Sequence, residues 1–236
     1  MVKCIPEGGI SNRLKVIISS LAEYNEICLQ WDISSVGGTG CGFNDLFQND
    51  FSGNSNRIIK DCCFIHSTMN THIFGSKTNL DKTLQSKYID VIKTLKPIDY
   101  VIKRVNTELE QLREFTTVSV RTFKSFPREF HGWGKHFNIN QLLSSMNNIT
   151  GKILLTCDDT DTVNILKDRY DVYITPKRTK FGDFSTVEGM QDILIDLYLG
   201  GHGTKIYGTN MSSFSEMQWW LGECKPKYNG MNLHKK

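Results

Sequence analysis

Apolar residues along the chain follow two spacings, one typical of buried strands and one typical of helices with a single apolar face. Residues 2–5 form a short apolar run that predicts a buried strand. Apolar side chains then recur at helical spacing from Leu14 to Leu21, and strand character returns over residues 27–31. The N-terminal half therefore begins as a strand, a helix and a second strand.

The C-terminal half repeats this alternation. The apolar pattern predicts strands at residues 116–121, 152–156, 172–175 and 205–207. Each is followed by a predicted helix, at residues 139–146, 160–170, 187–199 and 213–221. Alternation of this kind specifies a parallel sheet covered on both faces. We therefore predict an α/β fold in which two small Rossmann-like domains with mostly parallel sheets, residues 1–115 and 116–236, face each other across a cleft.

Composition narrows the class of protein. Hydrophobic residues make up 39% and charged residues 22% of the chain, and no apolar tract reaches the roughly 20 residues of a membrane helix. Because the start of the chain also lacks the pattern of a secretory signal, we expect a cytoplasmic protein with no membrane span. The net charge of +3 is spread along the sequence, so it predicts no nucleic-acid partner.

The cysteines predict free thiols rather than a disulfide framework or a metal site. Their number, seven, is odd, and several lie in or beside predicted buried strands. Cys62 and Cys63 are adjacent, but with His66 and His72 they form no recognisable zinc spacing. We therefore predict no bound metal.

A pair of glycines follows the first predicted strand, where the first helix begins. Without Cβ atoms, Gly8 and Gly9 let a bound group come close to the backbone, and Ser11 or Asn12 can cap the helix. The exposed N–H groups of a helix start favour an anion or a polar substrate. An ordinary strand-to-helix turn is the alternative, because the stretch matches neither G-x-G-x-x-G nor G-x-x-x-x-G-K-[ST].

Two further strand ends carry groups suited to a diphosphate. Alternation along residues 118–122 places Arg121 at the end of a strand, where its guanidinium can bind a diphosphate or form a surface salt bridge. The loop after residues 205–207 is rich in hydroxyls, so it can bind phosphate or simply cap the next helix through Ser212 or Ser213.

Carboxylates follow the predicted strand at residues 152–156. Such groups can accept hydrogen bonds from a base or a ribose. One of these carboxylates, Asp161, can instead be explained by the favourable interaction of an acidic side chain with the start of a helix.

Taken in order, these stretches resemble the fucosyltransferase-like glycosyltransferases, a superfamily that includes bacterial nodulation-factor and α1,2-fucosyltransferases, animal α1,6-fucosyltransferases and protein O-fucosyltransferases. GGISNRLKVIISSLAEY is similar to the family's Gly-Gly-x-x-Asn-[Arg/Gln] motif, and VSVRTF stands where the family has His-x-Arg-Arg. ILLTCDDTDTVNILKDRY resembles its Thr-Asp strand end, and MQDILIDLYLGGHGTKIYGTNMSSFSEMQWWLG its most recognisable region. The resemblance covers nearly the whole chain and rests on the order and spacing of the motifs.

The resemblance implies a GT-B fold, a nucleotide-sugar donor bound mainly by the C-terminal domain, and inverting transfer without a metal or another cofactor. It implies that Arg121 binds the diphosphate and that Asp192 and Asp196 lie in the helix before the last motif. The residues that it places near the nucleotide are Asp158, Asp159, Ser212, Ser213 and Phe214.

An inverting transfer needs a base for the acceptor hydroxyl and a cation for the leaving diphosphate. Arg121 can act as the cation. The resemblance makes Glu7 the candidate base, because some protein O-fucosyltransferases use a glutamate in a similar Pro-Glu-Gly position; otherwise Glu7 is a solvated loop carboxylate. The residues expected to approach the sugar and pyrophosphate from the N-terminal domain are Gly8, Gly9, Asn12 and Arg13.

The sequence thus predicts a glycosyltransferase that transfers fucose from GDP-fucose to a glycan acceptor. Ser119 and Thr122 differ from the family's histidine and second arginine, which favours another donor, rhamnosyl or xylosyl, as one alternative. A noncatalytic sugar-binding or nucleotide-binding module, in which Glu7 is no base, is the other.

Overall fold

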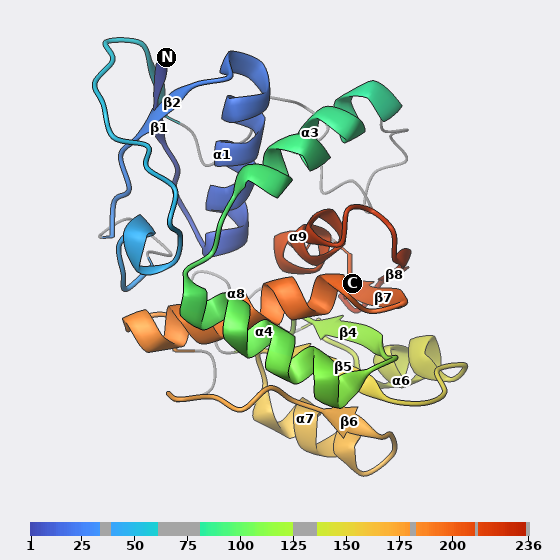
Figure 1. Ribbon diagram of the computed structural model, residues 1–236. Coiled ribbons are helices and arrows are strands. Elements are labelled where there is room, and N and C mark those ends of the chain that lie inside the picture. The colour runs from blue at the N-terminus through green and yellow to red at the C-terminus, as the bar shows by residue number, and fades with distance from the viewer. Residues whose placement is uncertain (34–38, 61–80, 125–135, 180–182, 211, 235–236) are drawn as a thin grey trace. The chain divides into compact units, whose positions relative to one another are not determined.

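The chain folds into two compact units, each built around a parallel sheet (Figure 1). The computed structural model describes residues 1–33, 39–60, 81–124, 136–179, 183–210 and 212–234. The first unit consists of Met1–Asn106 and Lys177–Ile195, and the second consists of Thr107–Pro176 and Asp196–Lys236. Helices α4 (Asp99–Leu112) and α8 (Val187–Gly201) each contribute residues to both units. The first unit is therefore completed by a segment from far along the chain.

The sheet of the first unit has its first strand in the middle, in the order β2-β1-β3, with both neighbours parallel to β1. Its elements are β1 (Val2–Ile5), α1 (Ile10–Tyr24), β2 (Ile27–Leu29), the 3-10 helix η1 (Phe43–Asp45), β3 (Ile58–Lys60) and α3 (Lys82–Thr94). The predicted strand, helix and strand are confirmed, because the apolar residues Leu14, Ile17 and Ile18 of α1 are fully buried.

Contacts at two places attach residues 183–191 to the rest of the first unit. The backbone N–H of Gly40 donates a hydrogen bond to the carbonyl of Phe184 at 2.7 Å. The side-chain amide of Gln191 donates to the carbonyl of Asp45 at 2.9 Å. A Cβ atom at position 40 would lie 2.1 Å from the carbonyl carbon of Ser185, so the close approach of the two backbones requires glycine.

The sheet of the second unit has the order β6-β5-β4-β7-β8, and all neighbouring strands are parallel. Its strands are β4 (Thr116–Val120), β5 (Ile153–Cys157), β6 (Val172–Tyr173), β7 (Lys205–Thr209) and β8 (Lys227–Met231). Its further helices are α6 (Ile139–Met146), α7 (Thr160–Lys167) and α9 (Ser213–Leu221). The strand order reverses between β4 and β7. Open α/β sheets bind ligands beyond the carboxyl ends of the strands at such a switch point.

The core of the second unit explains why β4 occupies the centre of its sheet. All five residues of β4 are buried. Val118, Leu154 and Ile206, from three adjacent strands, are completely inaccessible to solvent. Burying each such side chain contributes about 1.5–3 kcal/mol, so the carboxyl end of β4 is held by a rigid support.

The sequence analysis missed β8. Its residues, KYNGM, mix polar side chains and a glycine with few apolar ones, and among the described strands it lies at the edge of the sheet, next to β7. Backbone pairing with β7, rather than an apolar pattern of its own, determines this strand.

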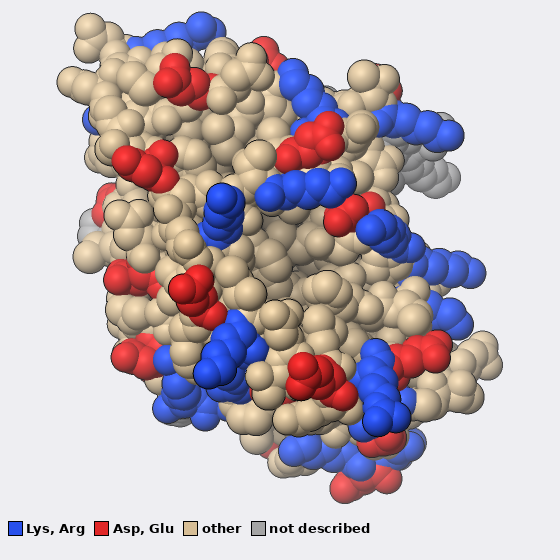
Figure 2. All heavy atoms as spheres, in the orientation of Figure 1, with Lys and Arg blue, Asp and Glu red and all other residues tan. Residues whose placement is uncertain are grey.

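On the face of the molecule shown in Figure 2, positive and negative side chains are mixed rather than grouped by sign. Figure 2 shows Lys and Arg side chains interspersed with Asp and Glu over the face in view. None of the helices in the described part of the chain is long and apolar enough to cross a membrane.

Candidate functional site

The chain turns sharply after β4, and one carboxylate holds this turn. Asp158, which follows β5, accepts hydrogen bonds from the backbone N–H groups of Thr122 at 2.7 Å and Phe123 at 3.1 Å. It also accepts one from the Thr122 hydroxyl at 2.8 Å and forms an ion pair with Nη1 of Arg121 at 3.3 Å. Phe123 has a left-handed backbone with a φ of 60°, which is unfavourable for a residue with a Cβ atom. Asp158 therefore stabilises a strained turn, and this turn fixes the backbone at Arg121.

The backbone of Arg121 is held on both sides. Its N–H donates to the hydroxyl of Thr209 at 2.9 Å, and its carbonyl accepts a hydrogen bond from Nε2 of His234 at 2.7 Å. The guanidinium carbon lies 5.3 Å from the centre of the Phe123 ring, and 25% of the side chain is exposed. Burial lowers the pKa of Arg121, and Asp158 opposes this shift. A partly desolvated guanidinium of this kind favours an anionic ligand.

Asp159 and Cys157, which also lie at this edge of the sheet, interact with other residues of the chain. Asp159 caps α7 by accepting a hydrogen bond from the N–H of Thr162, and it pairs with Lys124 at 2.9 Å. Burial raises the pKa of Asp159, but the hydrogen bonds from Thr162 and Lys124 outweigh it and hold that pKa below its usual value. Burial, aided by Asp158, raises the pKa of the Cys157 thiol to about 12. The predicted contacts of Asp158 and Asp159 with a base or ribose stay predictions.

The loop after β7 leads into α9, and the hydroxyl of the residue that starts this helix is not used to cap it. Ser212 is the N-cap residue of α9, yet its side chain makes no capping hydrogen bond, so ordinary capping does not explain this serine. Ser212 is 7% exposed, whereas Ser213 and Phe214 are half-buried. The N-terminal N–H groups of α9 therefore remain suited to a phosphate.

Pairing of β4 with β7 brings these predicted residues to one edge of the sheet. Ser119 lies opposite Gly208 in the register, so Arg121 and the start of α9 follow neighbouring strands. Asp158 and Asp159 follow β5 on the other side of β4. Thr209 and His234 were missed by the sequence analysis, because only the sheet order and the course of the C-terminus bring them to Arg121.

In the first unit, Arg13 is completely buried. Its Nε donates to the carbonyl of Gly8 at 2.7 Å, its Nη2 donates to the carbonyl of Asp32 at 2.7 Å, and its guanidinium stacks over Trp31 at 4.6 Å. Burial lowers the pKa of Arg13, against the opposing effects of Asp32, Cys41 and Glu7. Arg13 thus fixes the glycine turn, and its expected donor contact stays a prediction.

The glycine turn also corrects one expectation. The N-cap of α1 is Gly9, so Ser11 and Asn12 lie inside the first turn and neither of them caps the helix. The hydroxyl of Ser11 and Oδ1 of Asn12 are buried and have no hydrogen-bond partner among the described residues. Glu7, half-buried, comes directly before this turn.

Gly8 and Gly9 should respond differently to alanine. Gly8 has a φ of 78°, and a Cβ atom there would lie 3.3 Å from Nδ2 of Asn12. Gly9 has a φ of −69°, and its Cβ would meet nothing within 4 Å. We expect Gly8→Ala to lower the free energy of unfolding by about 1–2 kcal/mol and Gly9→Ala to lower it less, as measured by urea denaturation. Equal losses would contradict the two backbone conformations.

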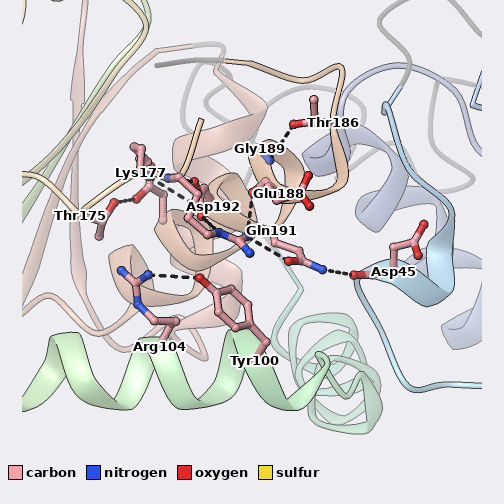
Figure 3. Close-up of polar contacts among 12 residues, drawn as sticks. Asp45, Tyr100, Arg104, Thr175, Lys177, Thr186, Glu188, Gly189, Gln191 and Asp192 are labelled. Carbon is pink, nitrogen blue, oxygen red and sulfur yellow. Dashed lines mark hydrogen bonds and ion pairs between the residues drawn. The ribbon is translucent and has the colours of Figure 1, made fainter. Parts of the chain in front are cut away.

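The two acidic residues noted in α8 bind the chain that follows β6. Asp192 is 2% exposed and accepts hydrogen bonds from the N–H of Arg178 at 2.7 Å and from its Nε at 3.1 Å. The guanidinium of Arg178 lies 4.2 Å from the ring centre of Tyr100. Figure 3 shows Asp192 beside Gln191, whose amide points to Asp45. Asp196, within the second unit, accepts a hydrogen bond from the Thr175 hydroxyl. Both acids therefore have structural partners.

The described residues contain no group of three or more His, Cys, Asp or Glu side chains that could hold a metal ion. Cys62, Cys63, His66 and His72 lie outside the described residues.

Comparison with known proteins identifies the fold. No family model matches the sequence, and no curated protein matches it significantly. Among solved structures, the NodZ α1,6-fucosyltransferase soaked with GDP-fucose superposes with a TM-score of 0.62 at 14% identity, over 93% of this chain and 91% of that chain. The chain has the fold of a fucosyltransferase. NodZ structures from Bradyrhizobium match as well, one at a TM-score of 0.59.

Two further fucosyltransferases share this fold. POFUT1 in complex with GDP matches at a TM-score of 0.52 and 9% identity, over 98% of each chain. A point mutant of Arabidopsis thaliana FUT1 in complex with GDP matches at a TM-score of 0.51 and 14% identity, over 94% of this chain and 68% of that chain. The predicted α/β fold with two parallel sheets is thereby confirmed.

Proposed function

We propose that the chain is a glycosyltransferase that transfers fucose from GDP-fucose to a glycan acceptor, with inversion and without a metal ion. The observation that carries the proposal is the partly buried guanidinium of Arg121 at the switch point of the second sheet. The start of α9, with the uncapped Ser212, follows the neighbouring strand. A cation and a helix start at one sheet edge suit a diphosphate. The GDP and GDP-fucose complexes of proteins with this fold support the same ligand.

The proposed reaction gives each residue one task. The acceptor oxygen forms a bond to the anomeric carbon of the sugar, the bond from that carbon to the phosphate oxygen breaks, and GDP leaves. Arg121 neutralises charge on the departing diphosphate, and the N–H groups and hydroxyls of Ser212 and Ser213 bind its oxygens. Glu7 takes the proton of the acceptor hydroxyl. We assign no step to a metal.

A different nucleotide sugar is the second candidate donor. Thr122 stands where the family has its second arginine, and its hydroxyl donates a hydrogen bond to Asp158. This turn therefore offers the donor one guanidinium, that of Arg121. A sugar other than fucose, such as rhamnose or xylose, remains a candidate on that ground.

Thermal unfolding in the presence of nucleotides tests the donor class. A ligand that binds only the folded state, at about 100 times its Kd, stabilises it by about 2.7 kcal/mol, which raises Tm by about 5–10 °C in a chain of this size. We expect GDP and GDP-fucose to give this shift and UDP and dTDP to give none. Protection by UDP or dTDP alone would end the assignment of fucose. Protection by no nucleotide, together with binding to glycans, would favour a noncatalytic module.

A further inference from the structure

The C-terminal tail, residues 232–234, runs back to the Arg121 turn. It follows β8, which ends at Met231 at the carboxyl edge of the second sheet. Leu233 is 1% exposed, and its carbonyl accepts a hydrogen bond from the N–H of Asn138 at 3.0 Å. Asn232 accepts a hydrogen bond from the side chain of Asn210. The tail is therefore anchored on both flanks before it reaches His234.

His234 contacts both the backbone and the ring of the Arg121 turn. Its Nε2 donates to the carbonyl oxygen of Arg121 at 2.7 Å. Its ring meets that of Phe123 edge-on, with the centres 5.3 Å apart, and lies 5.9 Å from the ring of Phe137. Phe123 is the residue with the left-handed backbone, so the imidazole packs on the strained position itself.

These contacts complete the restraint on the peptide groups around Arg121. The hydroxyl of Thr209 holds its N–H, His234 holds its carbonyl, and Asp158 holds the two residues that follow. A guanidinium binds a diphosphate more tightly when the backbone that carries it is already fixed, because ordering that backbone on binding would reduce the affinity.

We infer that His234 is a positioning residue for the diphosphate site, acting through the backbone of Arg121. The inference rests on the proposed function, since it assigns His234 a role in binding the GDP moiety. The role needs a hydrogen-bond donor at Nε2, which both the neutral Nε2–H tautomer and the imidazolium provide. It also makes the C-terminal tail part of the donor site, although the sequence of these three residues, NLH, carries no motif.

Three substitutions separate the hydrogen bond from the packing of the ring. His234→Phe keeps an aromatic ring against Phe123 and Phe137 but has no donor. His234→Gln keeps an N–H donor but loses the ring, and His234→Ala loses both. The matched control is His202→Ala, because His202 is an exposed histidine in the turn before β7, at the opposite end of that strand.

Isothermal titration with GDP and the KM for GDP-fucose give the decisive readouts, with Tm measured alongside. We expect His234→Phe and His234→Ala to weaken GDP binding and raise the donor KM about five- to thirtyfold, and His234→Gln to restore most of the loss. We expect kcat to change less than KM, and the control to match the unmodified chain.

Two results would overturn the positioning role alone. One is His234→Phe binding GDP as well as the unmodified chain does. The other is His234→Gln binding as weakly as His234→Ala, with Tm falling in parallel, which indicates a merely structural histidine. If the unmodified chain itself binds no GDP, the proposed function fails and the positioning role falls with it. Should His234→Ala not fold, the comparison of His234→Phe with His234→Gln decides the question.

Discussion

Arg121→Ala is expected to lower kcat/KM for GDP-fucose by about 10³-fold or more, because a single arginine that stabilises a leaving diphosphate contributes on that scale. The fold should survive the change. Asp158 keeps its hydrogen bonds to Thr122 and Phe123, and the lost ion pair involves a side chain that is 25% exposed. Because the Asp158 side chain is only 9% exposed, breaking this pair costs more than the ~1 kcal/mol of a fully exposed pair, but three hydrogen bonds still satisfy the Asp158 carboxylate. The rate of GDP release from GDP-fucose, measured with a mixture of oligosaccharide acceptors, gives the effect on turnover.

The matched control for Arg121→Ala is Arg169→Ala, at an exposed position between α7 and β6. It removes the same charge at the amino end of a strand and should leave turnover unchanged. Arg121→Lys should fall between the two, because an ammonium keeps the charge but cannot bind two phosphate oxygens side by side. Full turnover and full GDP affinity in Arg121→Ala would exclude the arginine from the reaction. A chain that loses GDP affinity but keeps its affinity for glycans would instead be a binding module.

Glu7→Gln is expected to reduce kcat by about 10²–10⁴-fold and to leave the Kd of GDP unchanged. The amide has nearly the shape of the carboxylate but cannot accept the proton of the acceptor hydroxyl. Because Glu7 belongs to the first unit and Arg121 to the second, the two variants should differ in kind. Loss of Glu7 should affect kcat alone, whereas loss of Arg121 should affect both GDP binding and kcat.

Glu23→Gln serves as the control for Glu7→Gln, since Glu23 is exposed near the far end of α1. Both variants should unfold at the same Tm as the unmodified chain. A Glu7→Gln variant with undiminished kcat would show that Glu7 is a solvated loop carboxylate, and the base would then have to be sought among other residues.

Most of the fold could be predicted from the sequence, because strands and helices with buried faces leave a clear apolar period. The run at residues 2–5 and the stripe of α1 are of this kind, and both are confirmed. β8 could not be predicted in this way. Its residues become a strand through pairing with β7, and a pattern search along the chain does not detect such pairing.

The sequence predicted the chemical character of the site residues, but it did not predict which residues they contact. The sequence indicates that Asp158 accepts hydrogen bonds, whereas the structure supplies Thr122 and Phe123 as donors. Arg13 is a plausible ligand for phosphate by its position after two glycines, yet Asp32 and Trp31, almost twenty residues further on, bury it. Partners so distant along the chain are set by the fold, and a single sequence does not show them.

The first unit is assembled from two separated stretches, and this arrangement constrains how the protein is made on the ribosome. The N-terminal stretch emerges first, but Phe184 and Gln191, which bond to Gly40 and Asp45, are translated much later. The nascent N-terminal stretch therefore lacks these two contacts while the intervening residues are synthesised. Since exposed apolar surface and unpaired strand edges favour aggregation during that interval, the speed of translation through the middle of the gene bears on the yield of folded protein.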